Sequence, residues 1–187
     1  TRVVAGAFRG CSSLASVELP DTVTSVGSYA FARCTSLPAA LEVPAGVTSV
    51  GDSAYEDCAQ ATSLSLPPTL SSVGTSAFAR CSSLASVEVP GSVGTLGAHS
   101  FDGCTSLASV RLSEGVRRLG ALAFQGCTSL ASVELPASLE STEGEAPWGA
   151  GPFEGSGLAS ARLAPGSTRV AAGAFRGCSS LASVELP

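Results

Sequence analysis

The sequence predicts an all-β solenoid, in which short parallel strands stack in one sheet and turns or short helical and 3-10 segments join them. Three observations predict this class. The fifteen residues from Gly6 to Pro20 return unchanged from Gly173 to Pro187. Cysteines recur at spacings of 23, 24, 23, 23 and 23 residues from Cys11 to Cys127. Within each repeat, Val and Leu alternate with polar residues, as in a strand with one buried face. We therefore expect an array of about eight repeats.

The first half of a repeat is expected to form a short helical turn followed by a strand. Phe8, Cys11 and Leu14 lie three residues apart, which is close to the spacing along one face of a helix. Val17 and Leu19 then alternate with polar residues, so their side chains are predicted to point inward from a brief strand.

The second half of a repeat returns the chain to the start of the next one. Pro20 ends the strand, because it has no amide hydrogen for a sheet ladder. Val23 and Val26 are expected to form the opposite wall of the coil. Gly27 follows at a turn where a positive φ would suit glycine. One repeat alone buries too little apolar surface to offset the entropy of ordering it, so neighbouring repeats must share one core.

In order, the motifs are L-x-x-V-x-L-P, V-x-x-V-G and A-F-x-x-C, at a period of about 23 residues. This pattern resembles the leucine-rich repeats of the BspA-like (Treponema pallidum) class over essentially the whole chain. The sequence departs from the class in using Val where Ile is frequent, and in a degenerate copy near Ser156. The resemblance implies a leucine-rich-repeat solenoid. The resemblance also weakly favours a cell-surface or secreted location, because the class includes surface adhesins.

Composition excludes several classes of protein. The formal net charge is −5 and only 13% of residues are charged, which argues against binding to a nucleic-acid backbone and against a disordered chain. No apolar run approaches the roughly 18 residues of a membrane span. We expect one domain over residues 1–187. We also expect it to be part of a longer array, because the sequence starts and stops inside a repeat.

The cysteines are predicted to be free thiols in the core. Their number is seven, so they cannot all be paired within the chain. Each occupies the same slot of its repeat, and the degenerate copy has Ser156 there instead. A small side chain with a weak S–H donor suits a buried slot of this kind. The spacing of Cys and His residues is not that of a zinc site, so no metal is expected.

Strand positions between the inward residues must point outward and form columns along the stack. The first column is almost entirely Ser. The second is acidic at first and alternates in sign from Glu88 onward, which relieves repulsion between stacked like charges. One interpretation is a solvated face that resists aggregation, and the other is a binding surface for a basic partner near Glu18 and Glu42. The charged candidates in this column are Glu18, Glu42, Glu88, Arg111, Glu134 and Arg162.

One repeat is interrupted by an insertion. Eighteen residues separate Leu135 from Phe153, six more than separate the equivalent positions of the first repeat. The extra residues fall in 140–152, which contains the chain's one tryptophan, Trp148. Insertions in arrays often lie on the binding face, and tryptophan is a common interface anchor. The alternative, which we favour, is that Trp148 covers the weakly apolar repeat beside it.

The sequence contains no recognisable catalytic constellation. His99 is the single histidine, and its slot is held by Tyr29, Ser76 and Leu122 in other repeats, so we expect it at the surface. No metal-ligand cluster occurs, and no glycine loop of the kind that cradles phosphate. We therefore expect no enzyme activity and no cofactor.

Three functions fit these observations. The first is a non-catalytic protein-interaction or scaffold module, which could be a subunit of a larger assembly. The second, suggested by the resemblance, is a cell-surface adhesion or host-matrix binding protein. The third is the repeat segment of a larger enzyme or receptor. In each case the expected partner is a protein, and neither nucleic acid nor a membrane span is expected.

Overall fold

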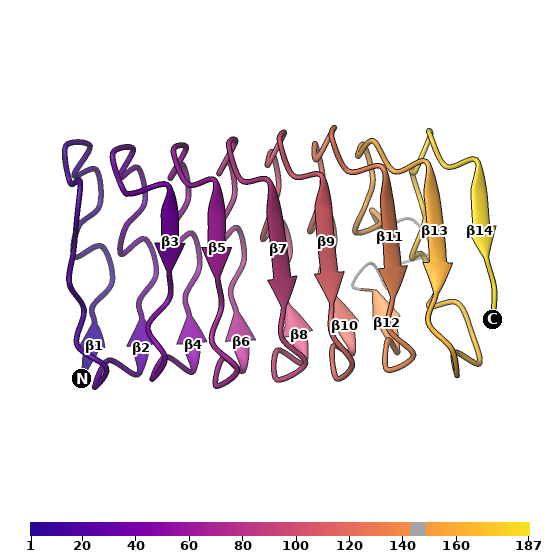
Figure 1. Ribbon diagram of the computed structural model, residues 1–187, viewed down its shortest axis with the longest axis horizontal. Coiled ribbons are helices and arrows are strands. Elements are labelled where there is room, and N and C mark those ends of the chain that lie inside the picture. The colour runs from indigo at the N-terminus through magenta and orange to yellow at the C-terminus, as the bar shows by residue number, and fades with distance from the viewer. Residues whose placement is uncertain (143–148) are drawn as a thin grey trace.

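The computed structural model describes residues 1–142 and 149–187, which form an elongated solenoid of about eight turns (Figure 1). Successive turns lie in register at the spacing of the sequence repeat. Arg2 pairs with Ser25, and Ser25 in turn pairs with Ser49. The repeat array predicted from the sequence is therefore confirmed as a parallel β-solenoid.

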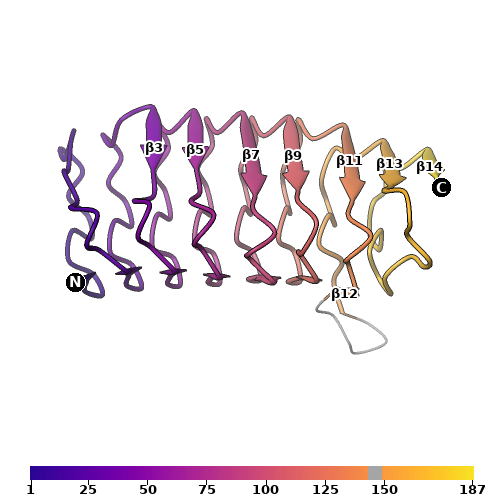
Figure 2. The same ribbon diagram turned by 60° about the horizontal axis from the view of Figure 1, so that its bottom comes forward.

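Two parallel sheets run along the solenoid, one more than the sequence predicts (Figures 1 and 2). Sheet B is the predicted one, with the motif L-x-x-V-x-L at its strands. Sheet A arises because the return wall also has an extended residue pair, one side chain outward and one inward. Sheet A contains β1 (Arg2–Val3), β2 (Ser25–Val26), β4 (Ser49–Val50), β6 (Ser72–Val73), β8 (Thr95–Leu96), β10 (Arg118–Leu119) and β12 (Ser141–Thr142). Sheet B contains β3 (Ala40–Glu42), β5 (Ser63–Ser65), β7 (Ser86–Val89), β9 (Ser109–Leu112), β11 (Ser132–Leu135), β13 (Ser160–Leu163) and β14 (Ser183–Glu185).

Sheet B begins at β3, so the strand predicted in the first repeat does not form. In the described part of the chain, no backbone hydrogen bond joins residues 15–19 to residues 38–43. The second repeat has one residue more than the first between its turn leucine, Leu37, and its first inward strand residue, Leu41. It also contains Pro38, which has no amide hydrogen to donate. The extra residue and the proline together account for the loss of pairing.

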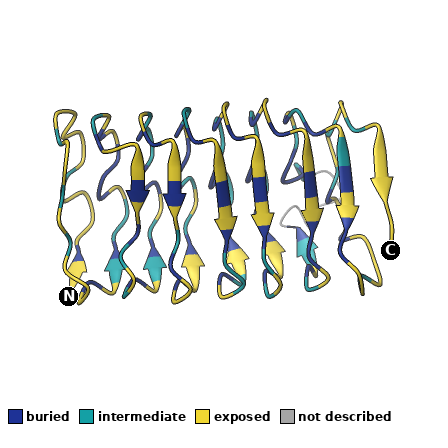
Figure 3. Cartoon of the chain, viewed as in Figure 1, coloured by how far each residue is buried: buried dark blue, intermediate teal, exposed yellow. Residues whose placement is uncertain are grey.

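A continuous apolar core lies between the two sheets. From β3 to β11, strand residues of sheet B alternate between exposed and buried, as in the exposed–buried–exposed–buried pattern of β7, β9 and β11, whereas all three residues of β14 are exposed (Figure 3). The aromatic slot forms a stack whose neighbouring ring centroids lie 5.0 to 5.6 Å apart, from Phe8 through Tyr55 to Phe153. Each turn therefore packs mainly on its two neighbours, as expected for a linear array.

The segments predicted as short helical turns are runs of hydrogen-bonded turns, and the described residues contain no helix. Tyr29 and Arg33 flank Phe31 with positive φ values of 58° and 62°, which interrupt a right-handed helix. The Cys34 amide donates to the Phe31 carbonyl at 3.1 Å, whereas the Phe31 amide donates to the Ala54 carbonyl of the next turn at 2.7 Å. Alternate amides thus bond within a turn and between turns.

Gly27 is needed for close approach of two turns, and not for the positive φ that its position suggests. A Cβ on Gly27 would lie 2.6 Å from the Ala5 nitrogen, and one on the equivalent Gly51 would lie 2.6 Å from the Ser28 nitrogen. Both glycines lack a left-handed φ. The left-handed conformation falls two residues later, at Tyr29.

Candidate functional site

The outward face of sheet B brings four of the predicted charged residues into one ladder. Strand pairing places Glu88 beside Arg111, Arg111 beside Glu134, and Glu134 beside Arg162. We call these four residues the charged column. The inward side chains of the same strands, such as Val87 and Val110, are held in the core, which fixes the outward direction of their neighbours.

The charged column is only loosely paired. The Arg111 Nη1 atom lies 3.7 Å from the Glu88 Oε1 atom, and their side chains are 74% and 58% exposed. Arg162 Nε approaches Glu185 Oε2 at 3.9 Å. Glu134 makes no ion pair within the described residues. Exposed pairs of this length contribute roughly 0–1 kcal/mol, so the fold does not depend on them.

Glu18 and Glu42 lie apart from the charged column. Glu42 is the last residue of β3 and is separated from Glu88 by Ser65 on β5. Glu18 lies on the unpaired segment of the first turn. Both line a groove of about 610 Å³ that opens between this segment and β3. Asp21 also lines this groove, and the sequence did not single it out.

Tyr55 is a second residue that sequence reasoning missed. It occupies the aromatic slot, where every other repeat has Phe, and its ring stacks between Phe31 and Phe78. The side chain lines the same groove and is only 2% exposed. Burial raises the pKa of its hydroxyl well above the ordinary value. The exchange of Phe for Tyr was visible in the sequence, but nothing in the sequence placed the hydroxyl beside a groove.

The remaining predicted positions lie elsewhere. Trp148 lies outside the described residues, as do residues 143–147 of the insertion at 140–152. His99 is partly exposed on a turn, and its Nδ1 atom lies 3.4 Å from Asp102 Oδ2. Within the residues that the structure describes, no group of three His, Cys, Asp or Glu side chains could hold a metal ion.

The cysteines form a column of thiols inside the solenoid. Cys34 Sγ donates to the Phe8 carbonyl at 3.0 Å, and Cys127 Sγ donates to the Phe101 carbonyl at 3.2 Å, in each case in the preceding turn. Burial raises the pKa of Cys127 to about 12. All seven thiols are free, as predicted. Cys11 is exposed and Cys178 is partly exposed, contrary to expectation, because the turns at the two ends of the described solenoid each pack on one neighbouring turn.

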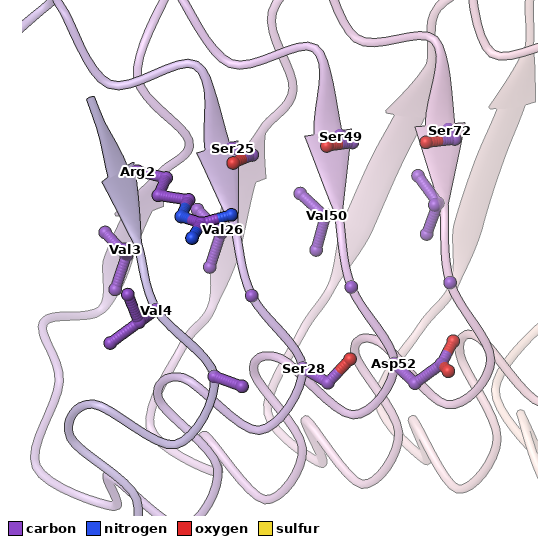
Figure 4. Close-up of a pocket in the computed structure, with 15 residues that line it drawn as sticks. Arg2, Val3, Val4, Ser25, Val26, Ser28, Ser49, Val50, Asp52 and Ser72 are labelled. Atoms are coloured by element: carbon purple, nitrogen blue, oxygen red, sulfur yellow. The ribbon is translucent and has the colours of Figure 1, made fainter.

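A second groove, of about 590 Å³, lies on sheet A (Figure 4). Ser25, Ser49 and Ser72 form a row along it, and Arg2 extends across one end. Asp52 lies on its other side, and the Oδ1 atom of Asp52 accepts a hydrogen bond from the Thr75 amide at 2.8 Å. This groove has a lining of small side chains without a dominant charge, so it is a weaker candidate than the surface of sheet B.

Comparison with known families gives a match to the BspA type leucine rich repeat region. Six copies of the repeat are found, in matches over residues 1–107 and 39–146. No curated protein is similar enough to count as a match. No described segment is a helix with the length and hydropathy that crossing a membrane requires.

Solved structures of leucine-rich repeat proteins are also similar to this chain. A Treponema pallidum leucine-rich repeat protein has a TM-score of 0.71 and 31% identity, over 97% of this chain and 71% of that one. A Bacteroides ovatus leucine-rich repeat protein has a TM-score of 0.68 and 24% identity, over 100% of this chain and 58% of that one. The pneumococcal vaccine antigen PcpA has a TM-score of 0.66 and 19% identity, over 84% and 40%. The last two similarities show the fold alone.

Proposed function

The chain belongs to the BspA-type leucine-rich repeat family, and from this premise we propose that it is a non-catalytic module that binds a protein partner through the outward face of sheet B. The repeat family supports a protein-interaction scaffold in general. The charged column is the observation that supports this particular face. Its side chains are held in register by the strands, yet they make at most long, exposed ion pairs with one another.

The geometry suits recognition by electrostatic complementarity. Signs alternate along the charged column, and the first turns add Glu18 and Glu42 without an intervening Arg in the same column. A partner whose own acidic and basic side chains alternate at the spacing of the charged column would be oriented along the solenoid axis. Complementary charges of this kind determine specificity and association rate more than raw affinity.

Removing the charged column tests the proposal. The variant Glu88→Ser, Arg111→Ser, Glu134→Ser, Arg162→Ser leaves the net charge unchanged and uses the residue already present in this column at Ser65. The control, Arg117→Ser with Glu140→Ser, removes an exposed pair outside sheet B, whose Nη1 and Oε1 atoms lie 3.4 Å apart. Partners retained by the immobilised chain are identified by mass spectrometry, and their affinity is measured by biolayer interferometry.

We expect the charged-column variant to bind its partner at least about tenfold more weakly, which corresponds to about 1.4 kcal/mol. The control variant should bind within about twofold of the original chain. Circular dichroism should show that both variants remain folded, because exposed substitutions change stability by about 0.5 kcal/mol or less. Equal binding by the charged-column variant and the original chain would refute the proposed face.

The other two expected functions remain predictions. An adhesion role would show as binding of the chain to matrix or cell surfaces through the same charged column. A role within a larger enzyme or receptor would require additional domains in the full-length protein. The four-residue variant bears on both, since each assigns the chain a protein partner.

A further inference from the structure

The groove at the start of sheet B combines apolar walls with an acidic rim. Val17 and Leu19 form one wall, and Leu41 and Val43 form the facing wall on β3 and just beyond it. No Arg lies among the residues that line it. Three carboxylates therefore lie around an apolar space, and none of them makes an ion pair within the described residues. The rim residues are Glu18, Asp21 and Glu42, and Phe31 and Tyr55 lie deeper.

The groove is a consequence of the irregular second repeat. Elsewhere in sheet B, neighbouring strands are joined by backbone hydrogen bonds that close the space between turns. Between residues 15–19 and 38–43 these bonds are missing from the described structure. Val17 and Leu19 are only partly buried, whereas the equivalent Val87 and Val89 of a central turn are buried. Phe31 and Tyr55 line the inner part of the groove and are only 0% and 2% exposed.

Tyr55 supplies a polar group within this opening. Its hydroxyl has no hydrogen-bond partner among the described residues, although the side chain is only 2% exposed. Ser100 alone among the described residues has a fully enclosed side-chain oxygen or nitrogen without a partner. The Tyr55 oxygen is therefore not fully enclosed, and the Tyr55 side chain lines the groove. Burying a polar group costs free energy unless the group makes a hydrogen bond, and a bound ligand could supply that bond.

We propose that this groove binds the cationic side chain, arginine or lysine, of an exposed segment of a partner protein. The aliphatic stem would lie against Val17 and Leu41, as such stems do on apolar surfaces. The cationic head would lie among the rim carboxylates and donate to the Tyr55 hydroxyl oxygen. This inference rests on the proposed function, because it assigns one contact of the protein partner.

The lining excludes the simpler occupants. A divalent cation needs several oxygen ligands close together, and the described part of the chain has no such group of acidic side chains. A purely apolar ligand would bring three carboxylates out of water without a counter-charge, which is strongly unfavourable. A side chain with an apolar stem and a positive head satisfies both the walls and the rim.

The test uses acetyl-arginine-methylamide as the probe and acetyl-citrulline-methylamide as its uncharged isostere. Each is titrated into the whole chain and followed by ¹⁵N–¹H correlation spectra. We expect the arginine probe to shift amides of residues 17–21 and 41–45, and the citrulline probe to bind at least about tenfold more weakly. Glu18→Gln with Glu42→Gln should abolish the shifts. Asp102→Asn, which removes a carboxylate on a distant turn, should leave them unchanged.

Tyr55→Phe tests the hydroxyl directly, and it should fold because Phe occupies this slot in every other repeat. We expect it to weaken binding of the arginine probe by about threefold to tenfold. Equal binding of the two probes, shifts spread over all acidic residues, or unchanged binding by Tyr55→Phe would overturn the inference. If no shifts occur while the charged-column variant still loses its partner, the inference fails alone. If the probe binds the groove but that variant keeps every partner, the proposed function fails alone.

Discussion

Single residues deviate from the repeat in ways that have measurable costs. Ser100 occupies a slot that holds Ala30, Ala54, Ala77 and Ala123 in neighbouring repeats. Its side chain is fully buried, and its hydroxyl oxygen has no hydrogen-bond partner among the described residues. An unsatisfied buried hydroxyl loses its hydration without compensation. The repeat therefore carries a local destabilisation at this position.

Replacing Ser100 by Ala should stabilise the chain by about 1 kcal/mol, because it removes the unsatisfied group and leaves a side chain that fits this slot elsewhere. Urea denaturation followed by circular dichroism measures the change. The reverse exchange, Ala123→Ser, should destabilise by about 1–3 kcal/mol. A loss of stability in Ser100→Ala would show that the hydroxyl has a favourable contact.

The sequence predicts the slots of the repeat better than their exceptions. The aromatic slot, the cysteine slot and the inward strand residues of the central turns follow directly from the spacing, whereas Val184 and Leu186, predicted to point inward, are exposed. The groove could not be predicted, because it depends on a missing ladder between residues 15–19 and 38–43 and on where the Tyr55 hydroxyl points. Pro38 and the extra residue beside it indicate in the sequence that the second repeat is irregular. The loss of strand pairing that they cause can be recognised only from the path of the backbone in the structure.

At the scale of elements, the turns show why three-residue spacing was misleading. Spacing such as that of Phe8 and Cys11 fits a helix, yet two left-handed residues, Gly6 and Gly10, interrupt the segment. Tyr29, Ser53 and Leu122 adopt positive φ without being glycine, although the same slot is glycine in the first and last repeats, at Gly6 and Gly173. Bonds between turns stabilise that backbone, and such bonds are not encoded within a single repeat.

The thiol column makes the stability of the chain sensitive to alkali. Burial raises the pKa of Cys81 and Cys127 to about 12, and it also raises the pKa of Cys34, Cys58 and Cys104. A raised folded-state pKa contributes stability that is complete below the unfolded value, about 8.5, and lost as pH rises above it. The chain has no lysine, so few other groups titrate in this range.

We therefore expect the free energy of unfolding to fall between pH 7.5 and 9.5 in the presence of a reductant, by about 1.4 kcal/mol for each of Cys81 and Cys127, whose pKa is about 12. Denaturation curves at the two pH values measure this. At pH 7.5, a disulfide reagent should modify Cys11 rapidly and the five buried thiols only after unfolding. Equal stability at both pH values, or rapid modification of all seven thiols, would contradict the assignment.

The whole molecule behaves as a stack in which each turn is stabilised by its neighbours. This much follows from the sequence, because a repeat of about 23 residues cannot bury its apolar face alone. The second sheet does not follow from it, because a strand of two residues is too short to leave a periodic signal. Its ladder, from β1 to β12, becomes visible only when the turns are stacked.

Stacking predicts that the same substitution costs more in the middle of the solenoid than at its end. Phe101 packs between Phe78 and Phe124 and is fully buried, whereas Phe8 stacks on Phe31 alone and is partly exposed. Phe101→Ala should destabilise the chain by about 3–5 kcal/mol, the range for a large cavity in a core.

Phe8→Ala should cost less than half as much, because it removes packing with one neighbour only and leaves no enclosed cavity. Urea denaturation of the two variants and the original chain measures both changes. Hydrogen exchange of the first turn's amides, compared with those of the central turns, shows whether the loss is local, as a linear array requires. Equal costs at the two positions would mean that unfolding is governed by the molecule as one unit and not by contacts between adjacent turns.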